Sequence, residues 1–340
     1  RMKIEVQAAR AAKLGVPLHD KLVGYLPHYA PFAARWHQVF NMRDANPVLR
    51  KASQVLAGFS SRRSLPKWRP DTYRDRSDWR YNTGEQDTRA REVVLFADTF
   101  NRYFERENLD DTLAVLAAAG YRVYAPLPEN PNERPLCCGR TFLAVGLVEE
   151  ARREMQRTLD ALAPYVARGI PVVGLEPSCL FTFRDEMSAL FKGEAANALA
   201  ANTLLLEEFI MREHKQGHFN PVLAPMPKKA LLHGHCHQKA FNTMGAVEAS
   251  LRLVPQLSVE TVESSCCGMA GSFGYDAATI DVSLRMGELS LLPAVRRAPS
   301  DALIVADGTS CRHQIHDGCE REAIHVARVL KMSLDALPSD

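Results

Sequence analysis

Seven cysteines are the residues of this chain whose type and spacing are best suited to chemistry. Two Cys-Cys-Gly tripeptides, at 137–139 and 266–268, are each followed by a cysteine that ends an apolar run. Thiolates are soft, anionic ligands of iron–sulfur clusters, zinc and iron, and two adjacent cysteines can bind different atoms of a cluster. We therefore predict metal ligands at Cys137, Cys138, Cys179, Cys236, Cys266, Cys267 and Cys311. The eighth cysteine, Cys319, has no counterpart, and we expect it to pack as a small apolar residue.

Oxygen and nitrogen donors next to these cysteines are candidate additional ligands. Mixed ligation would suit a single zinc or iron ion, or a cluster with unusual ligands. In an extended strand His233, His235 and His237 would point away from Cys236, so a strand here must end near residue 235 before both kinds of donor can share an ion. The additional ligands that we predict are Asp98, Glu176, His235 and His237.

Three basic residues and one glycine accompany the cysteine motifs. Arg140, Arg184 and Lys239 could neutralise a thiolate-rich centre or bind a carboxylate substrate, or they could be ordinary surface residues. Gly268 opens a turn whose backbone N–H groups could bind cluster sulfides or an anion. A tight strand-to-helix turn would explain the same glycine.

The elements that must position these residues form an internal duplication. Each copy has an apolar strand-like run, a helical stretch, a second strand, the Cys-Cys-Gly turn, a long helical stretch and a third strand. Strands that alternate with helices predict βαβ units and a parallel sheet, whose strands all end at one edge. Ligands bind at that edge in α/β folds, so cysteines far apart in sequence should converge there. The corresponding segments are 91–104 and 229–241, 109–120 and 246–255, 121–127 and 258–264, 141–167 and 276–296, and 170–179 and 302–311.

The predicted fold class is α/β, with two pseudo-symmetric βαβ-type cysteine-rich modules that have parallel sheets and follow an α-helical N-terminal segment. The expected divisions are a helical segment at 1–60, a basic linker at 61–91, a first module at 92–225 and a second at 226–340. The linker arginines either keep the chain soluble or dock onto an acidic face of a missing domain or partner.

Composition narrows the functional classes. With 46% apolar and 24% charged residues in 340, the chain is typical of globular proteins and not of disordered ones. A net charge of +2 excludes a generally basic nucleic-acid binder. The chain has no run of 18 apolar residues that would form a transmembrane segment, and its first residues lack a signal-peptide pattern. We therefore expect a cytoplasmic protein with reduced thiols.

The cysteine pattern resembles the duplicated cysteine-rich (CCG) domain. That domain occurs in heterodisulfide reductases, in the iron–sulfur subunits of glycolate and anaerobic glycerol-3-phosphate dehydrogenases, and in lactate-utilisation proteins. The resemblance covers about 92–335. A closer branch comprises fused FAD and iron–sulfur dehydrogenases of D-2-hydroxy acids, similar to bacterial D-lactate and D-2-hydroxyglutarate dehydrogenases. The segments similar to the C-terminal part of that branch are EVQAARAAKLGVPLHDKLVGYLP, LFADTFNRYFE, EPSCLFTFRDE and HGHCHQKA.

The resemblance implies that residues 1–60 end a ferredoxin-like domain and that the chain is part of a longer enzyme, inactive by itself. FAD on a missing domain would oxidise the hydroxy acid. Electrons would then pass through iron–sulfur centres, of the 4Fe-4S kind, to a quinone or cytochrome. The expected partners are the upstream FAD and ferredoxin-like domains and the electron acceptor. Assembly of the chain into a homo-oligomer is left open. A peripheral location at the inner membrane is compatible with this role.

The chain departs from the family motif, which is one cysteine, a Cys-Cys pair and then Cys-x-x-Cys. Thr99 stands at the first cysteine of copy one, while Glu176 and Gly308 stand at the first position of Cys-x-x-Cys. The copies therefore hold three and four thiolates, which makes disulfide reduction of the heterodisulfide-reductase kind the weakest alternative. The stronger alternative is a structural module with zinc or a single iron that caps the flavin site or mediates oligomerisation.

Overall fold

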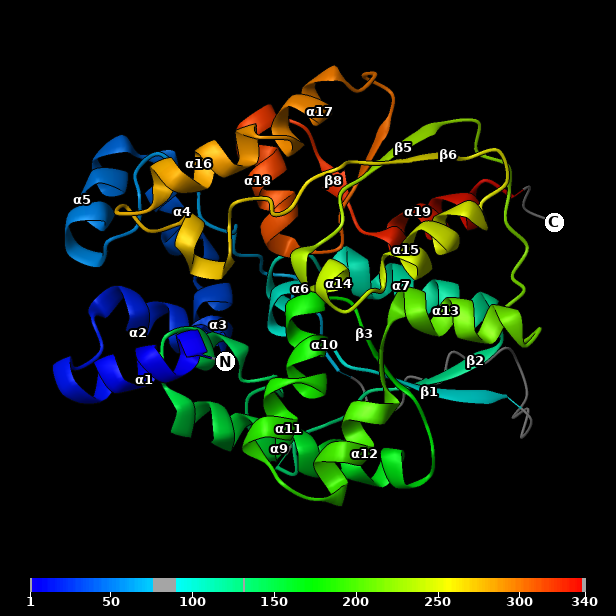
Figure 1. Cartoon of the computed structure of the whole chain (residues 1–340), viewed down its shortest axis with the longest axis horizontal. Coiled ribbons are helices and arrows are strands. Elements are labelled where there is room, and N and C mark those ends of the chain that lie inside the picture. The colour runs from blue at the N-terminus through cyan, green and yellow to red at the C-terminus, as the bar shows by residue number, and fades with distance from the viewer. Residues whose placement is uncertain (1, 76–89, 131, 338–340) are drawn as a thin grey trace.

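The computed structural model describes residues 2–75, 90–130 and 132–337 (Figure 1). Residues 76–89, which hold part of the predicted basic linker, lie outside the described residues. The division into a linker and two modules at the boundaries given above stays a prediction.

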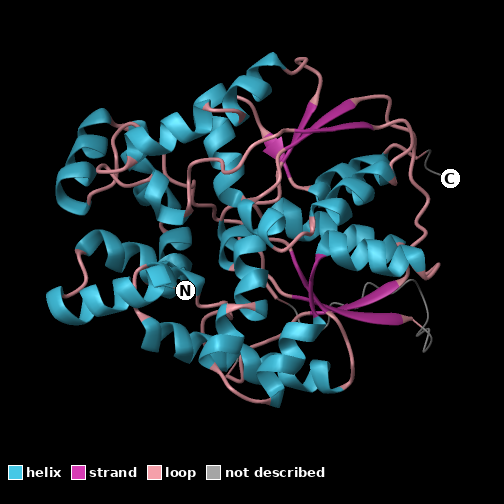
Figure 2. Ribbon diagram, in the orientation of Figure 1, coloured by secondary structure: helices cyan, strands magenta, loops and turns pink. Residues whose placement is uncertain are grey.

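Two four-stranded parallel sheets form the framework of the molecule (Figure 2). The first has the order β2-β1-β3-β4 and the second the order β6-β5-β7-β8, so the two topologies are identical. This confirms the predicted α/β class with two parallel-sheet modules. The strands are β1 Arg91–Leu95, β2 Tyr121–Tyr124, β3 Val172–Gly174, β4 Thr203–Leu205, β5 Lys229–Leu232, β6 Ser258–Thr261, β7 Leu303–Val305 and β8 Ala323–Ile324.

Helices connect consecutive strands in both modules, as parallel neighbours require. The first module contains α6 Thr99–Tyr103, α7 Arg106–Ala118, α8 Arg140–Ala144, α9 Val148–Ala167, α10 Pro177–Arg184, α11 Glu186–Leu190, α12 Glu194–Asn202 and α13 Leu206–Lys215. The second contains α14 Cys236–Ala240, α15 Met244–Arg252, a 3-10 turn η1 Gly271–Gly274, α16 Ile280–Glu288, α17 Leu291–Arg297, α18 Thr309–Cys319 and α19 Val326–Asp335.

The strand register shows which residues of the two modules are equivalent. Leu95 lies opposite Val173 in the first sheet, and Leu232 lies opposite Val305 in the second. The next N–H group along each strand, from Phe96 or His233, donates to the carbonyl of Val173 or Val305 at 2.8 Å. Phe96 and His233 are therefore equivalent. The same register aligns 98 with 235, 99 with 236, 176 with 308, and 179 with 311.

A layer of four helices lies between the two sheets and belongs to both modules. Helices α7 and α13 come from the first module, α15 and α19 from the second, and their apolar faces share one core (Figure 1). Leu116, Phe209, Leu251 and Leu330 are fully buried in it. Each such side chain stabilises the fold by about 1.5–3 kcal/mol. The shared core fixes one module against the other, and with it the two cysteine sites.

The N-terminal segment is helical, as predicted, and contacts both modules. Its helices are α1 Met2–Leu14, α2 Leu18–Gly24, α3 Leu26–Arg35, α4 His37–Ala45 and α5 Pro47–Ala57. The Thr141 hydroxyl, just after the first Cys-Cys-Gly turn, donates to the carbonyl of Gly24 at 2.9 Å. In the second module, the N–H of Ser60 donates to the carbonyl of Tyr275 at 2.7 Å. Among the described residues, no helix combines the length and apolar character that crossing a membrane would require.

Candidate metal centres

The cysteines lie where parallel strands end and helices begin. β5 ends at Leu232 and α14 begins with Cys236, so the strand stops before residue 235, as the sequence required. Cys311 lies in the first turn of α18, and Cys179 lies at the equivalent place in α10. The partial positive charge at a helix N-terminus stabilises a thiolate. The helix N-termini thus favour the thiolate form of these cysteines, which is the form that binds a metal cation.

The second module brings its four predicted cysteines together. Hydrogen bonds link Cys236 to Cys266, Cys266 to Cys267, and Cys267 to Cys311. Cys267 and Cys311 are buried, whereas Cys236 and Cys266 are half-buried. The two buried sulfur atoms and a ring nitrogen of His233 all lie within 4.8 Å of one another. These hydrogen bonds lower the pKa values of Cys266 and Cys311 and, together with burial, raise those of their partners Cys236 and Cys267.

The first module brings together three thiols whose pKa values are all raised. A hydrogen bond with Cys138, together with burial, raises the pKa of Cys137 well above its usual value. Burial does the same for Cys138. At Cys179 a hydrogen bond from Cys138 lowers the pKa, but burial and nearby carboxylates outweigh it and raise the pKa to about 12. A metal that binds here must displace three protons, which weakens binding at neutral pH.

The two predicted carboxylate ligands of the first module cap helices. Asp98 Oδ1 accepts hydrogen bonds from the N–H groups of Phe100 and Asn101, and Oδ2 accepts one from the Asn101 side chain. Glu176 Oε1 accepts from the N–H and the hydroxyl of Ser178, and Oε2 accepts from the N–H of Thr309 in the second module. Burial, with Glu176 nearby, raises the pKa of Asp98 to about 6. The oxygen atoms of both carboxyl groups are therefore already occupied by hydrogen bonds.

The predicted histidine ligands have different surroundings. His235 caps α14, and its Nδ1 accepts from the N–H of His237 at 3.2 Å, so the ring hydrogen sits on Nε2 and that atom cannot bind a metal. The His237 ring packs against His235 and Phe181, and its Nδ1 has no hydrogen-bond partner among the described residues. Burial, His235 and Arg140 lower the pKa of His237 to about 3, which keeps its ring neutral.

Of the three predicted basic residues, only Lys239 lies beside the second-module thiols, whose charges oppose the lowering of its pKa by burial. Arg140 is paired with Glu186, and Arg184 with Glu208. Gly268 has a φ of +93°, and its N–H donates to Cys266 Sγ at 3.4 Å. Cys319 lies apart, with its sulfur 3.5 Å from the carbonyl of Leu292.

Arg63 is a residue of this site that the sequence did not indicate. Its side chain is 1% exposed, and none of its three guanidinium nitrogens has a hydrogen-bond partner among the described residues. Burial lowers its pKa, while Asp317, Tyr275 and Cys267 oppose that shift, which places the cation near the second-module thiols. Nothing in a run of linker arginines distinguishes the one that tertiary packing buries.

A second buried group has the residue types of a metal site but the wrong hydrogen bonding. Ligand atoms of Glu207, Asp307 and His325 lie within 4.8 Å of one another between the modules. His325 Nδ1, however, accepts from the N–H of Ala327 at 3.0 Å, so its Nε2 carries the hydrogen and faces the carbonyl of Leu175 at 3.2 Å. We therefore interpret this group as a buried acid in the apolar core.

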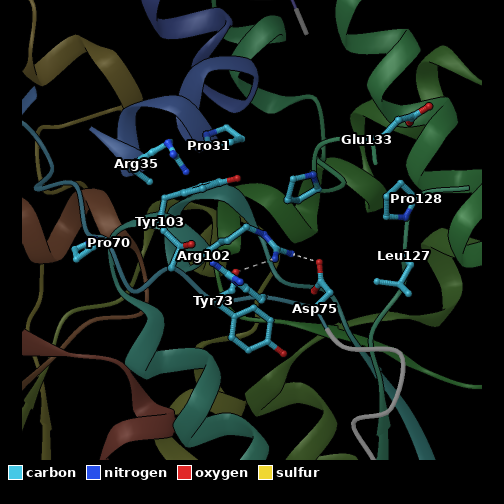
Figure 3. Close-up of a pocket in the computed structure, with 14 residues that line it drawn as sticks. Pro31, Arg35, Pro70, Tyr73, Asp75, Arg102, Tyr103, Leu127, Pro128 and Glu133 are labelled. Carbon is cyan, nitrogen blue, oxygen red and sulfur yellow. Dashed lines mark hydrogen bonds and ion pairs between the residues drawn. The ribbon is translucent and has the colours of Figure 1, made fainter. Parts of the chain in front are cut away.

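A pocket of about 930 Å³ opens between the N-terminal helices and the first module (Figure 3). Arg102 lies in it, and its guanidinium is paired with Asp75 at 2.7 Å and donates to the carbonyl of Tyr73 at 3.2 Å. Because Asp75 already neutralises the charge of Arg102, this side chain would contribute little to the binding of an anion in the pocket.

No family model matches the chain, but comparison with known proteins finds several homologues. It is 29% identical over 308 residues to D-2-hydroxyglutarate dehydrogenase of Escherichia coli, covering 88% of this chain and 29% of that protein. It is 26% identical over 319 residues to a subunit of anaerobic glycerol-3-phosphate dehydrogenase of Escherichia coli, covering 93% and 76%. The chain is a homologue of these proteins. Lactate utilization protein A of Bacillus licheniformis is 28% identical over 255 residues, which cover 70% of this chain and 98% of that protein.

These relatives confirm the resemblance that the cysteine motifs indicated. The chain spans less than a third of the D-2-hydroxyglutarate dehydrogenase that it matches, and about three quarters of the glycerol-3-phosphate dehydrogenase polypeptide.

Proposed function

We propose that the chain is a metal- or iron–sulfur-binding electron-transfer module of a flavin-dependent D-2-hydroxy-acid dehydrogenase. The observation that carries the proposal is the meeting of four thiols at one sheet edge in a homologue of dehydrogenase proteins. In this role the module receives electrons from FAD on another domain and passes them to an acceptor such as a quinone or cytochrome. The hydroxy acid is of the D-lactate or D-2-hydroxyglutarate type.

The donor set of the second module fits such a centre. An iron–sulfur centre, when bound, takes up and releases single electrons. Cys236, Cys266, Cys267 and Cys311 would hold it, and burial of Cys267 and Cys311 would keep water from it. Lys239 and Arg63 would offset its negative charge. The first module offers Cys137, Cys138 and Cys179 alone, because its carboxylates cap helices, so we place the working centre in the second module.

The partners that we propose are the FAD and ferredoxin-like domains, which would dock on the N-terminal helices. These helices expose large apolar side chains, among them Met2, Val6, Trp36, Val39 and Val55. Such surfaces in soluble proteins mark interaction sites. We propose a cytoplasmic protein, peripheral at the inner membrane if its acceptor is a quinone.

Metal and acid-labile sulfide analysis of the anaerobically purified chain tests the proposal. We expect iron and sulfide in the unaltered protein, loss of both in Cys311→Ala, and little change in Cys179→Ala, the equivalent substitution in the first module. Cys319→Ala is the control, because that sulfur lies outside both sites. Absence of both iron and sulfide from the unaltered protein would contradict the proposal.

One observation favours a second function, a structural module with a single zinc or iron ion. Donors bound to one tetrahedral zinc at about 2.0–2.3 Å lie roughly 3.3–3.8 Å apart, and the close group formed by His233, Cys267 and Cys311 needs little movement to reach that spacing. One equivalent of zinc without visible charge-transfer absorption would support this function and exclude electron transfer.

A further inference from the structure

His233 has a buried ring nitrogen whose neighbours are sulfur atoms. The side chain is 1% exposed, Nε2 has no nitrogen or oxygen partner among the described residues, and the ring shares a hydrogen bond with the Cys311 thiol. A ring nitrogen of this residue lies within 4.8 Å of the sulfur atoms of both Cys267 and Cys311. An orphaned polar atom in the interior costs free energy unless something binds it. We propose that Nε2 of His233 is a ligand of the metal centre in the second module.

The other ring nitrogen prepares His233 for that role. Nδ1 lies 3.0 Å from the hydroxyl oxygen of Ser264, which also accepts from Lys239 Nζ at 3.3 Å. A hydroxyl oxygen has two lone pairs, so it can also accept the hydrogen on Nδ1, and that tautomer leaves the Nε2 lone pair free to bind a metal. A metal-binding histidine is ordinarily held through its second nitrogen in this way.

The neighbouring His235 is held in the opposite tautomer, and it also blocks the position of the missing cysteine. A Cβ atom on Gly308 would lie 2.4 Å from Cδ2 of the His235 ring. A thiolate at position 308 is therefore sterically incompatible with this arrangement. His233 supplies a donor to the same group of sulfurs from the end of β5 instead.

The first module lacks this nitrogen. Its equivalent residue is Phe96, which is buried and packs edge-on against Phe183 with ring centroids 5.0 Å apart. His233 thus replaces an apolar residue only where four thiols are present. This difference between the modules supports a ligand role for His233, because the equivalent Phe96 shows that an apolar side chain can fill the same position.

The inference deepens the proposed function and rests on it, and the substitution His233→Phe tests it. The full 340-residue chain is loaded with cobalt(II) alone, and separately with iron and sulfide, and metal affinity is measured by chelator competition. We expect His233→Phe to weaken binding by at least about 100-fold, because loss of an outer-shell partner alone costs 10–100-fold. His316→Phe, in which an exposed ring paired with Glu322 is replaced, should bind as the unaltered chain does.

A spectroscopic measurement on the unaltered chain keeps the test independent of folding in the variant. Pulsed EPR of the cobalt-loaded or reduced iron–sulfur form should show hyperfine coupling to a histidine nitrogen, which changes character when the chain is labelled with ¹⁵N-histidine. A metal-loaded chain without that coupling, or a His233→Phe variant with unchanged affinity, would overturn the inference and leave the proposed function standing. A chain that binds neither cobalt nor iron would overturn both.

Discussion

Cysteine thiols at equivalent positions in the two modules differ in how readily they lose a proton and bind a metal ion. Equivalent cysteines, Cys179 and Cys311, have pKa values shifted in opposite directions. A hydrogen bond with Cys138 lowers the pKa of Cys179, but burial and nearby carboxylates outweigh it, whereas a hydrogen bond with Cys267 and nearby histidines lower the pKa of Cys311 despite its burial. The cysteines were predictable, because their types and spacing are local properties of the sequence. The roles of His233 and Arg63 depend on which atoms packing leaves without partners, so no spacing rule indicates them.

Arg63 is expected to act in opposite ways with and without the centre. In the metal-free chain its buried guanidinium forms a long ion pair with Asp317, at 3.8 Å, and no hydrogen bond with the described residues. We predict that Arg63→Met stabilises the metal-free chain by about 1–3 kcal/mol, the cost of a buried polar group without hydrogen-bond partners, because Asp317 keeps its hydrogen bonds from Ser64. The same change should weaken metal binding, because an anionic centre loses its counter-charge. Thermal unfolding and chelator competition measure the two effects.

Arg62→Met is the matched control for this substitution. The neighbouring Arg62 is exposed and paired with Asp281, so its replacement should change neither stability nor affinity appreciably. Unchanged metal affinity in Arg63→Met would contradict the proposed counter-charge role.

Glu207 is expected to make stability depend on pH. Burial, together with Asp307, raises its pKa well above the ordinary value. The folded chain therefore holds a proton that the unfolded chain releases near pH 4.3, so the free energy of unfolding falls as pH rises above about 5. We predict that Glu207→Met stabilises the chain at pH 8 and flattens this dependence. Urea unfolding from pH 5 to pH 8 measures it, with the exposed Glu149→Gln as control.

An unaltered slope in Glu207→Met would show that another group causes the pH dependence. A destabilised variant at pH 8 would contradict the interpretation of Glu207 as a buried acid without a metal.

At the scale of elements, the strands and helices around the cysteines follow their sequence patterns closely. The strands β1, β2, β5 and β6 lie within the predicted segments, which are short strand-like runs that recur in the same order in both copies. β4 and β8 were not predicted, because the repeated pattern was followed only as far as Cys179 and Cys311 and both strands lie beyond it. The capping roles of Asp98 and Glu176 were also missed. An acidic residue before a helix satisfies backbone N–H groups as readily as it binds a metal.

The two Cys-Cys-Gly turns should tolerate side chains unequally. A Cβ on Gly268 would lie 2.3 Å from the carbonyl oxygen of Ser283, and one on Gly139 would lie 2.9 Å from that of Ala151. Both glycines also have positive φ values. We predict that Gly268→Ala destabilises the chain by about 1–3 kcal/mol or more and that Gly139→Ala costs less. Denaturant unfolding measures the difference.

Gly245→Ala provides the comparison, because this glycine lies within α15 and a Cβ there meets no atom within 4 Å. It should stabilise the chain by about 0.5–1 kcal/mol. Equal costs for Gly268→Ala and Gly139→Ala would contradict the close approach at Ser283.

At the scale of the whole molecule, two equivalent folds have acquired unequal sites. The repeat was detectable because the Cys-Cys-Gly turns and strand ends recur in the same order. The helix layer that joins the modules was not, because each of its helices is individually an ordinary amphipathic segment. The N-terminal segment contacts the residues after both cysteine pairs, through Gly24 at Thr141 and through Ser60 at Tyr275. The chain therefore folds around its two sites as one unit, and of the two cysteine sites only the second has the donors that we propose for a metal centre.

If the second module carries electrons, a redox titration of the metal-loaded chain will detect the transfer. We predict a reversible one-electron spectroscopic change in the unaltered chain and in Cys179→Ala, and its loss in Cys311→Ala. Zinc has no redox chemistry. A chain that retains one zinc ion and shows no spectroscopic change across the titration would contradict an electron-transfer role for the second module.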